Sequence, residues 1–211
     1  MLRRTLFLCS SFLLLNAFVL PGLSTTDTAS AAIHMITPEP VAPSPSLTIT
    51  RPSLVLNLDR LPHVLPSIVD DETLWLARGI YSETKRAEEQ WLVAWVIRNR
   101  VETQYRGVAN YQDAVLDPYQ FSAFNRGSQV RRFYSQLDPD SRSFGWAHAL
   151  SIAYHVRHLS EAYRPFSAET RHFYSERSMR HRSAPAWADG FDALPIEDIE
   201  AERFRFFADV I

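Results

Sequence analysis

The chain has 211 residues, of which 46% are hydrophobic and 12% aromatic, with 22 Lys+Arg against 24 Asp+Glu and one Cys. These values exclude a disordered chain, a collagen-like repeat and a small protein held together by disulfides. A formal net charge of −2 gives no support for a protein that binds nucleic acid.

Residues 1–31 have the pattern of a secretory signal peptide. A positively charged start precedes the apolar run Leu6–Leu20, and Ala29-Ser30-Ala31 offers the small residues of a cleavage site. We therefore expect export to the periplasm, the cell envelope or the outside, with a retained anchor helix as the alternative. Cleavage after Ala31 would remove Cys9, and the mature chain would then have no thiol for a disulfide, a nucleophile or a metal.

Residues 32–70 are predicted to be a Pro-rich linker or extended arm, because they hold seven of the 13 prolines. Leu54, Leu56 and Leu58 alternate with small or polar residues, which predicts one strand or a docked arm. Residues 71–211 hold all five Trp, all eight Tyr and ten of the 13 Phe. A domain of that size can bury a core, so 71–211 is predicted to be the folded domain.

The first helix is predicted over 71–83, with Asp70 or Asp71 as its cap. Leu76, Ile80 and Glu83 share one face of this helix, which places a carboxyl among residues that should point at the core. A carboxyl that loses hydration has a raised pKa and can act as a general acid. The alternative is a salt bridge from Glu83 to Lys85, Arg86 or Arg78.

The remaining pattern predicts a mainly helical (α+β) fold with a small β element. A second helix over 87–102 is apolar on every side between residues 91 and 97, so it should be central and nearly enveloped. Only three residues separate the two helices, so the chain must turn sharply after Glu83. We expect loops and short turns over 103–127, helices over 128–137 and 144–163, and strands at 172–175 and 204–207. The stripe predicted to be buried on the last helix is Trp146, Ala149, Leu150, Ala153 and Val156.

Several segments of this domain resemble the cell wall hydrolases of the spore-cortex-lytic enzyme type (SleB-like). The specific ones are Leu76-Ala-Arg-Gly-Ile-Tyr-Ser-Glu83, Val93-Ala-Trp-Val-Ile-Arg-Asn-Arg-Val101 and Gln120-Phe-Ser122, and weaker ones are Arg171-His-Phe-Tyr174, Pro185-Ala-Trp187 and Arg203-Phe-Arg-Phe-Phe207. Together they cover nearly all of residues 71–211. The chain departs from the family where it reads Glu83-Thr-Lys-Arg-Ala in place of Glu-Ala-x-Gly-Glu, and its gap before the next helix is about two residues shorter.

The resemblance implies a lysozyme-like fold that cleaves the MurNAc–GlcNAc bond of peptidoglycan, most simply as a lytic transglycosylase. An ordinary glycosidase needs two carboxylates, whereas a transglycosylase can use one as acid and then as base. Glu83 is the implied catalytic residue. We interpret the nearest loop carboxylates, Asp113 and Asp117, as turn residues.

The resemblance also implies substrate-binding residues, which are Gln120, Phe121, Ser122, His172 and Tyr174. An amide and a hydroxyl can hold sugar groups, but Gln120 and Ser122 could instead pin their loop to the second helix. His172 and Tyr174 alternate on one strand face, where His172 could also be an ordinary core histidine. Asn99 and Arg100 are expected to tie loops together without a chemical role.

The implied partner is the glycan strand of peptidoglycan, bound by a monomer with no cofactor, no metal, no nucleic acid and no membrane contact beyond the signal peptide. One alternative is a zinc-dependent peptidoglycan amidase that uses His148, His155 and His158, which lack a His-Glu-x-x-His pattern. The other is a non-catalytic peptidoglycan-binding module. Its aromatic residues would act with four arginines, Arg171, Arg177, Arg180 and Arg182.

Overall fold

The computed structural model describes residues 57–179, 181, 183–196 and 203–210. All of these described residues belong to one compact unit of the chain. The predictions of a signal peptide over 1–31 and of a linker before residue 57 lie outside the described residues. Among the described residues, no helix is both long and apolar enough to cross a bilayer.

Helix α1 (Asp71–Glu83) has the predicted bounds. It begins there because the side chain of Asp70 accepts a hydrogen bond of 2.8 Å from the backbone N–H of Thr73, which satisfies one of the free donors of the first turn. It ends there because Thr84 is extended, with φ −154° and ψ 163°. Glu83 is therefore the last residue of the helix.

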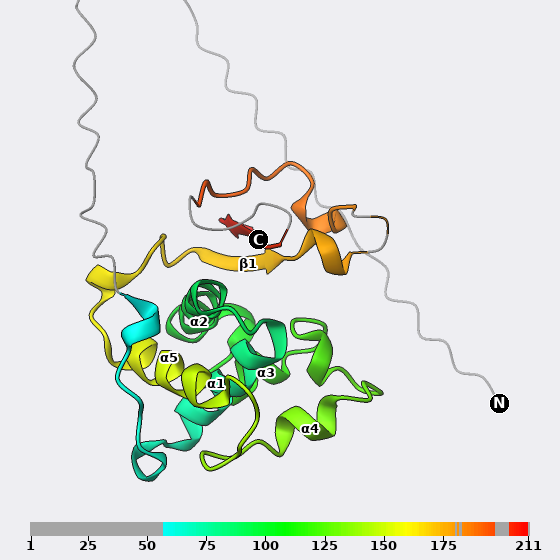
Figure 1. The fold of residues 1–211 in the computed structure, drawn as a ribbon. Helices are drawn as coiled ribbons and strands as arrows, with labels where there is room; N and C mark the ends of the chain where they lie inside the picture. Colours follow the sequence, from blue (N-terminus) through cyan, green and yellow to red (C-terminus); the bar gives the residue numbers. More distant parts are fainter. Residues whose placement is uncertain (1–56, 180, 182, 197–202, 211) are drawn as a thin grey trace, which may run out of the picture. The chain divides into compact units, whose positions relative to one another are not determined.

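Helix α2 (Ala87–Glu102) is the central helix of this unit, as predicted. Twelve of its 16 residues are buried, and helices α1, α3 (Tyr111–Leu116) and α5 (Trp146–His158) and strand β1 (Thr170–Tyr174) pack around it (Figure 1). Trp95 is among the largest fully buried side chains. The apolar run on every side of this helix is thus explained by neighbours on every side.

The segment between α2 and α5 contains two short helices. Helix α3 (Tyr111–Leu116) lies in the region predicted as loop, and its cap is Asn110, whose side chain accepts from the N–H of Asp113 at 2.7 Å. Helix α4 (Arg131–Ser135) is shorter than the predicted 128–137. Both helices are held by packing on α1, a tertiary effect that periodicity over five or six residues does not reveal.

Helix α5 (Trp146–His158) is shorter than the predicted 144–163 at both ends. Gly145 precedes it with φ 72°, a left-handed conformation that favours glycine, and Leu159 follows it in an extended conformation. A separate 3₁₀ turn, Glu161–Tyr163, takes up the predicted C-terminal end. The predicted apolar stripe is buried in full (Trp146, Ala149, Leu150, Ala153 and Val156).

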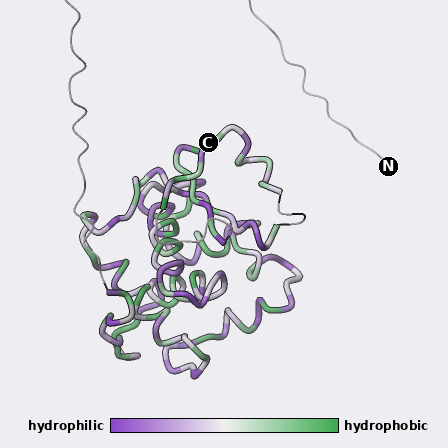
Figure 2. The backbone as a smooth tube through the Cα atoms, turned by 45° about the horizontal axis from the view of Figure 1, so that its top comes forward, coloured by the Kyte–Doolittle hydropathy of each residue, from purple (hydrophilic) through white to green (hydrophobic). Residues whose placement is uncertain are grey.

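Strands β1 (Thr170–Tyr174) and β2 (Arg205–Ala208) form a two-stranded antiparallel sheet, which confirms both predicted strands within two residues. His172 lies opposite Phe207 and Tyr174 opposite Arg205. Strand β1 runs along α2 in Figure 1, so the sheet covers one side of the central helix. The unit is therefore mainly helical with a small β element. Hydrophobic and hydrophilic residues alternate along its helices, as expected where one face of a helix is buried (Figure 2).

The described end of the predicted linker packs on this unit. Leu61 is buried, and the N–H of Val64 donates to the hydroxyl of Ser151 on α5 at 3.3 Å. Leu58 lies in a 3₁₀ turn, Leu58–Arg60, where a strand was one expectation. Leu54 and Leu56 lie outside the described residues. Residues 57–70 of the predicted linker are thus a docked arm.

Candidate active site

The carboxyl of Glu83 lies at the end of α1 and is half-buried. Leu76 and Ile80, which share its helix face, are fully buried. In the part of the chain that the structure describes, this carboxyl takes part in no hydrogen bond and no ion pair. The guanidinium of Arg78 donates to the carbonyl of Leu137 at 2.7 and 3.0 Å. The expected salt bridge at the helix end is therefore absent among these residues, and the carboxyl stays available to a ligand.

Burial raises the pKa of Glu83 from 4.5 to about 7, and the positive charges of Arg100 and Lys85 oppose this rise. Burial disfavours the charged form of a carboxyl because the interior solvates an anion poorly. The two cations lie within electrostatic range but outside ion-pair contact, so they only partly offset the loss of hydration. Glu83 can therefore hold a proton near neutral pH and can also release it.

Arg100 is a buried cation that acts on Glu83 through its charge and bonds to the sheet. Its side chain is 3% exposed, and its Nε donates to the carbonyl of Arg171 on β1 at 2.7 Å. Burial lowers its pKa to about 10, which still leaves it cationic at neutral pH. Its Nη1 is buried without a hydrogen-bond partner. The site thus has a fixed positive charge inside the protein, on the side of α2 that faces β1.

The expectation that Asn99 and Arg100 tie loops together is confirmed. The amide of Asn99 donates to the carbonyls of Ser167 and Thr170, at 3.0 and 2.8 Å. Arg100 has a second role that the sequence did not predict, because its charge also acts on Glu83. An arginine three residues after the apolar stretch 91–97 was the available signal, since a buried cation implies a partner.

Phe121 lies at the centre of the Gln120-Phe121-Ser122 segment and packs beneath Arg100. Its ring is 1% exposed, and its centroid lies 5.7 Å from the Arg100 guanidinium carbon and 6.1 Å from the Phe173 ring. Gln120 is half-buried and Ser122 exposed. Among the described residues, neither of these two side chains bonds to α2, so the pinning alternative gains no support. Their amide and hydroxyl remain available for a ligand.

His172 is buried and neutral. The hydroxyl of Tyr105 lies 3.0 Å from its Nε2, and the rings of Tyr105 and Trp187 flank it, each at 5.2 Å between centroids. Burial, and after it the charges of nearby arginines with Arg100 first among them, lower the pKa of His172 to about 4. A histidine with this pKa does not exchange protons near neutrality. Its place close to Arg100 suits a structural or hydrogen-bonding role.

Tyr174 lies in a second, smaller cluster. Its ring stacks on Phe207 at 5.7 Å and meets Trp187 at 5.9 Å. Because Trp187 contacts both His172 and Tyr174, the two side chains do share a face, as predicted. None of the described contacts joins Tyr174 to Glu83 or Arg100, so the structure gives no support for placing it at the site.

The two loop carboxylates have different surroundings. Asp113 is exposed and accepts from the Asn110 amide at 2.9 Å, which fits its interpretation as a turn residue. The carbonyl of Asp117 closes a turn by accepting from Gln120 N–H at 3.2 Å. Its carboxylate also pairs with Arg106 at 3.5 Å and acts on the pKa of Arg100. Asp117 is thus a second acid in the neighbourhood of Arg100.

The turn after Glu83 is held by hydrogen bonds to the first turn of α2. The Thr84 hydroxyl donates to the buried carboxylate of Glu89, and the Gln90 amide donates to the Thr84 carbonyl at 2.8 Å. Arg203, which precedes β2, donates to the same Glu89 carboxylate at 3.0 Å. These bonds fix the direction in which the chain leaves Glu83.

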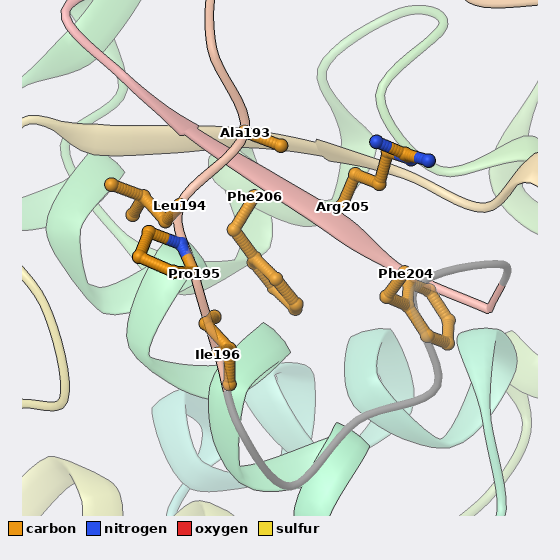
Figure 3. Close-up of a pocket in the computed structure, with 7 residues that line it drawn as sticks. All are labelled: Ala193, Leu194, Pro195, Ile196, Phe204, Arg205 and Phe206. Atoms are coloured by element: carbon orange, nitrogen blue, oxygen red, sulfur yellow. The ribbon is translucent and has the colours of Figure 1, made fainter.

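A pocket of about 230 Å³ lies elsewhere in this unit, between the 193–196 segment and β2 (Figure 3). Its lining is largely apolar and includes Leu194, Ile196 and Phe206. None of the predicted site residues lines it. The candidate site around Glu83 is therefore identified by its burial and by the charges that act on it. The pocket is separate from this site.

Two of the three histidines proposed as zinc ligands bond to their own helix. Nδ1 of His155 lies 2.7 Å from the Ser151 carbonyl, and Nδ1 of His158 lies 2.7 Å from the Tyr154 carbonyl. The residues described by the structure contain no group of three or more His, Cys, Asp or Glu side chains placed to hold a metal ion.

Comparisons of the chain with protein-family models, with curated proteins and with solved structures find no match. The geometry brings together Glu83, Arg100, Phe121 and His172 from four separate segments, with Arg100 in range of the other three. A half-buried carboxyl beside a buried cation can donate a proton and accept one back. The arrangement can therefore perform general acid–base chemistry.

Proposed function

We propose that this protein is an exported peptidoglycan-cleaving enzyme that acts on the MurNAc–GlcNAc bond as a lytic transglycosylase. The observation that carries the proposal is the carboxyl of Glu83, which makes no hydrogen bond or ion pair with the residues that the structure describes and whose pKa burial raises to about 7. A general acid works best when its pKa is close to the working pH. The proposed fold is lysozyme-like, and the mainly helical architecture, with Glu83 ending a helix before a buried one, agrees with it.

In the first step of the proposed reaction, protonated Glu83 gives its proton to the glycosidic oxygen as the bond from C1 of MurNAc breaks. The resulting carboxylate then takes the proton of the sugar's own C6 hydroxyl, whose oxygen attacks C1 and closes a 1,6-anhydro ring. One carboxyl serves both steps because it is returned to its starting state. The charges of Arg100 and Lys85 stabilise the carboxylate between the steps.

The binding part of the proposal assigns Gln120 and Ser122 to the glycan. An amide has two donors and an acceptor, and a hydroxyl can do both, which suits the N-acetyl and hydroxyl groups of the sugars. Phe121 is buried beneath Arg100, so its role is to support the guanidinium. His172, neutral and bonded to Tyr105, would hold β1 against the site and would not carry protons.

Mass analysis of digests of purified sacculi tests the proposal. We expect soluble muropeptides with 1,6-anhydromuramyl ends from the native protein and none from Glu83→Gln. The matched control is Glu88→Gln, an exposed carboxyl in the first turn of α2, which should leave the products unchanged.

Other product patterns would overturn the proposal in recognisable ways. Reducing ends would indicate a hydrolase that uses a second acid, for which Asp117 is the nearest candidate. Stem peptides released in a chelator-sensitive reaction would indicate a zinc amidase. Binding to sacculi without any release, equal in native protein and Glu83→Gln, would indicate a non-catalytic binding module.

A further inference from the structure

Lysine occurs once in the 211 residues, against 21 arginines, and this lysine is Lys85, two positions after Glu83. Its ammonium group donates to the backbone carbonyl of Tyr81. The nitrogen lies 3.4 Å from the centroid of the Tyr81 ring and 5.5 Å from that of Tyr134. A carbonyl and two aromatic faces therefore hold a positive charge at one place beside the helix end.

The ammonium of Lys85 and the carboxyl of Glu83 act on each other without forming an ion pair. Burial lowers the pKa of Lys85 to about 8, and the charge of Glu83 opposes this shift. The charge of Lys85 in turn lowers the pKa of Glu83. The turn between them is fixed because the Thr84 hydroxyl bonds to Glu89 on α2. Their separation is thus set by the fold.

The other charged and titratable groups around this pair come from three elements. Tyr81 comes from α1, Arg100 from α2 and Tyr134 from α4, and the pKa of Tyr134 is raised by burial and by the charge of Glu83. Arg100 is buried and cationic throughout the working range. Lys85 is exposed as a residue, but its ammonium lies against the Tyr81 and Tyr134 rings, and its lowered pKa lets it lose its charge. Lys85 is therefore the cation of the site whose charge changes with pH. An arginine at this position would stay charged over the same pH range.

We propose that Lys85 is a positioning residue of the Glu83 site: its ammonium, held by the Tyr81 carbonyl and over the Tyr81 and Tyr134 rings, stabilises the Glu83 carboxylate across the fixed turn between them. The catalytic meaning of this role rests on the proposed function. The electrostatic pairing itself does not, and it can be measured without activity. A purely structural alternative exists, because a lysine that bonds a carbonyl of the last turn also stabilises a helix C-terminus.

The single lysine makes the test selective. Reductive methylation with ¹³C-formaldehyde labels only Lys85 and the N-terminal amine, so the titration of Lys85 can be followed as one NMR signal in the full chain. Removal of the neighbouring charge in Glu83→Gln should lower the pKa of Lys85 by about half a pH unit or more. Glu88→Gln, which changes an exposed carboxyl on α2, should leave it in place.

The reverse measurement must agree, because coupling between two sites is reciprocal. In Lys85→Met, the pKa of Glu83 should rise by the same amount, read from the ¹³C carboxyl signal that Glu83→Gln removes. Lys85→Arg keeps the charge and should keep the pKa of Glu83 near its native value. Arg86→Gln changes the next cation in the turn, which acts on Glu89, and serves as the matched control.

An unchanged Lys85 titration in Glu83→Gln would overturn the proposal. So would a Lys85→Met variant that only melts at a lower temperature while Glu83 titrates as before, since that result identifies a helix cap. If Lys85→Met does not fold, the Glu83→Gln measurement decides alone. A protein that releases nothing from sacculi but shows the coupled titrations would refute the proposed function and still support the pairing.

Discussion

The side chain of Thr84 donates a hydrogen bond to the carboxylate of Glu89, which is 2% exposed. Arg203 donates to the same carboxylate at 3.0 Å, and the backbone N–H of Arg86 donates to the Thr84 hydroxyl at 3.1 Å. The turn directly after Glu83 is therefore tied to the first turn of α2 and to the residue that leads into β2. A buried charge with these partners holds the end of α1 in place.

Replacement of Glu89 by Ala should destabilise the protein strongly. It leaves the guanidinium of Arg203 without its buried partner, and loss of one member of such a pair costs about 3–5 kcal/mol. Urea unfolding followed by circular dichroism measures this change. The neighbouring exposed Glu88→Ala should stay within about 0.5 kcal/mol of the native protein. Equal effects of the two substitutions would show that the Glu89 network contributes nothing.

Activity on sacculi should fall as the pH rises through about 7, the pKa of Glu83. The first step needs the protonated carboxyl, and the fraction that is protonated decreases tenfold per pH unit above the pKa. The pH dependence of kcat/KM at low substrate concentration reports this pKa in the free enzyme. A rate that stays constant from pH 6 to 9 would contradict Glu83 as the general acid. Glu83→Gln should lose about 10²–10⁴-fold in rate.

Glu83→Gln should also be more stable than the native protein at high pH. Because burial raises the pKa of Glu83 from 4.5 to about 7, the folded state binds this proton more tightly than the unfolded state does. The native protein therefore loses stability between pH 4.5 and 7, while the amide does not titrate. The difference should vanish below pH 4.5 and reach about 1–3 kcal/mol above pH 7. Thermal melts of both proteins at pH 4, 6 and 8 measure it, and a gap that shrinks with rising pH would contradict the burial of this carboxyl.

His172 should destabilise the protein in acid. Burial lowers its pKa to about 4, so the folded state resists the proton that the unfolded state takes up at about 6.5. Stability from this group is complete above pH 6.5 and is lost as the pH falls through about 4. The ring signals of His172 in NMR should titrate near pH 4, well below the ordinary histidine value of 6.5. Titration near pH 6.5 would show that the ring is hydrated.

Gly79→Ala should destabilise α1, although alanine normally favours a helix by about 0.5–1 kcal/mol over glycine. A Cβ at Gly79 would lie 2.8 Å from Cγ2 of Val115 on α3 and 3.1 Å from Cδ1 of Ile97 on α2. Such overpacking costs about 1–3 kcal/mol. The double variant Gly79→Ala with Val115→Ala should recover part of the loss, because it removes the nearest methyl groups. Free energies of unfolding in urea give the comparison, and a more stable single variant would refute the close approach.

The sequence by itself predicted the elements whose signals are local. Helix α1 has an Asp cap and an apolar face, and α2 has a long apolar run, so their bounds were predicted to the residue. Both strands were predicted from short β-prone segments. The position of Glu83 on an apolar face, and hence a raised pKa, also follows from helical spacing alone. The helix bounds, the strands and the helix face of Glu83 all depend mainly on residues that are close in sequence, so the sequence pattern is sufficient to predict them.

The tertiary structure alone decided which distant groups surround Glu83. Arg100 meets Phe121 and Arg171 because α2 is enclosed by a loop on one side and β1 on another. The lengths of α4 and α5 were also decided by their neighbours, since short helices are stabilised by the surfaces they cover. Charges that act through space belong to no single segment of the chain. For this reason Arg100 can be identified as a charge that acts on Glu83 only when the folded chain brings the two near.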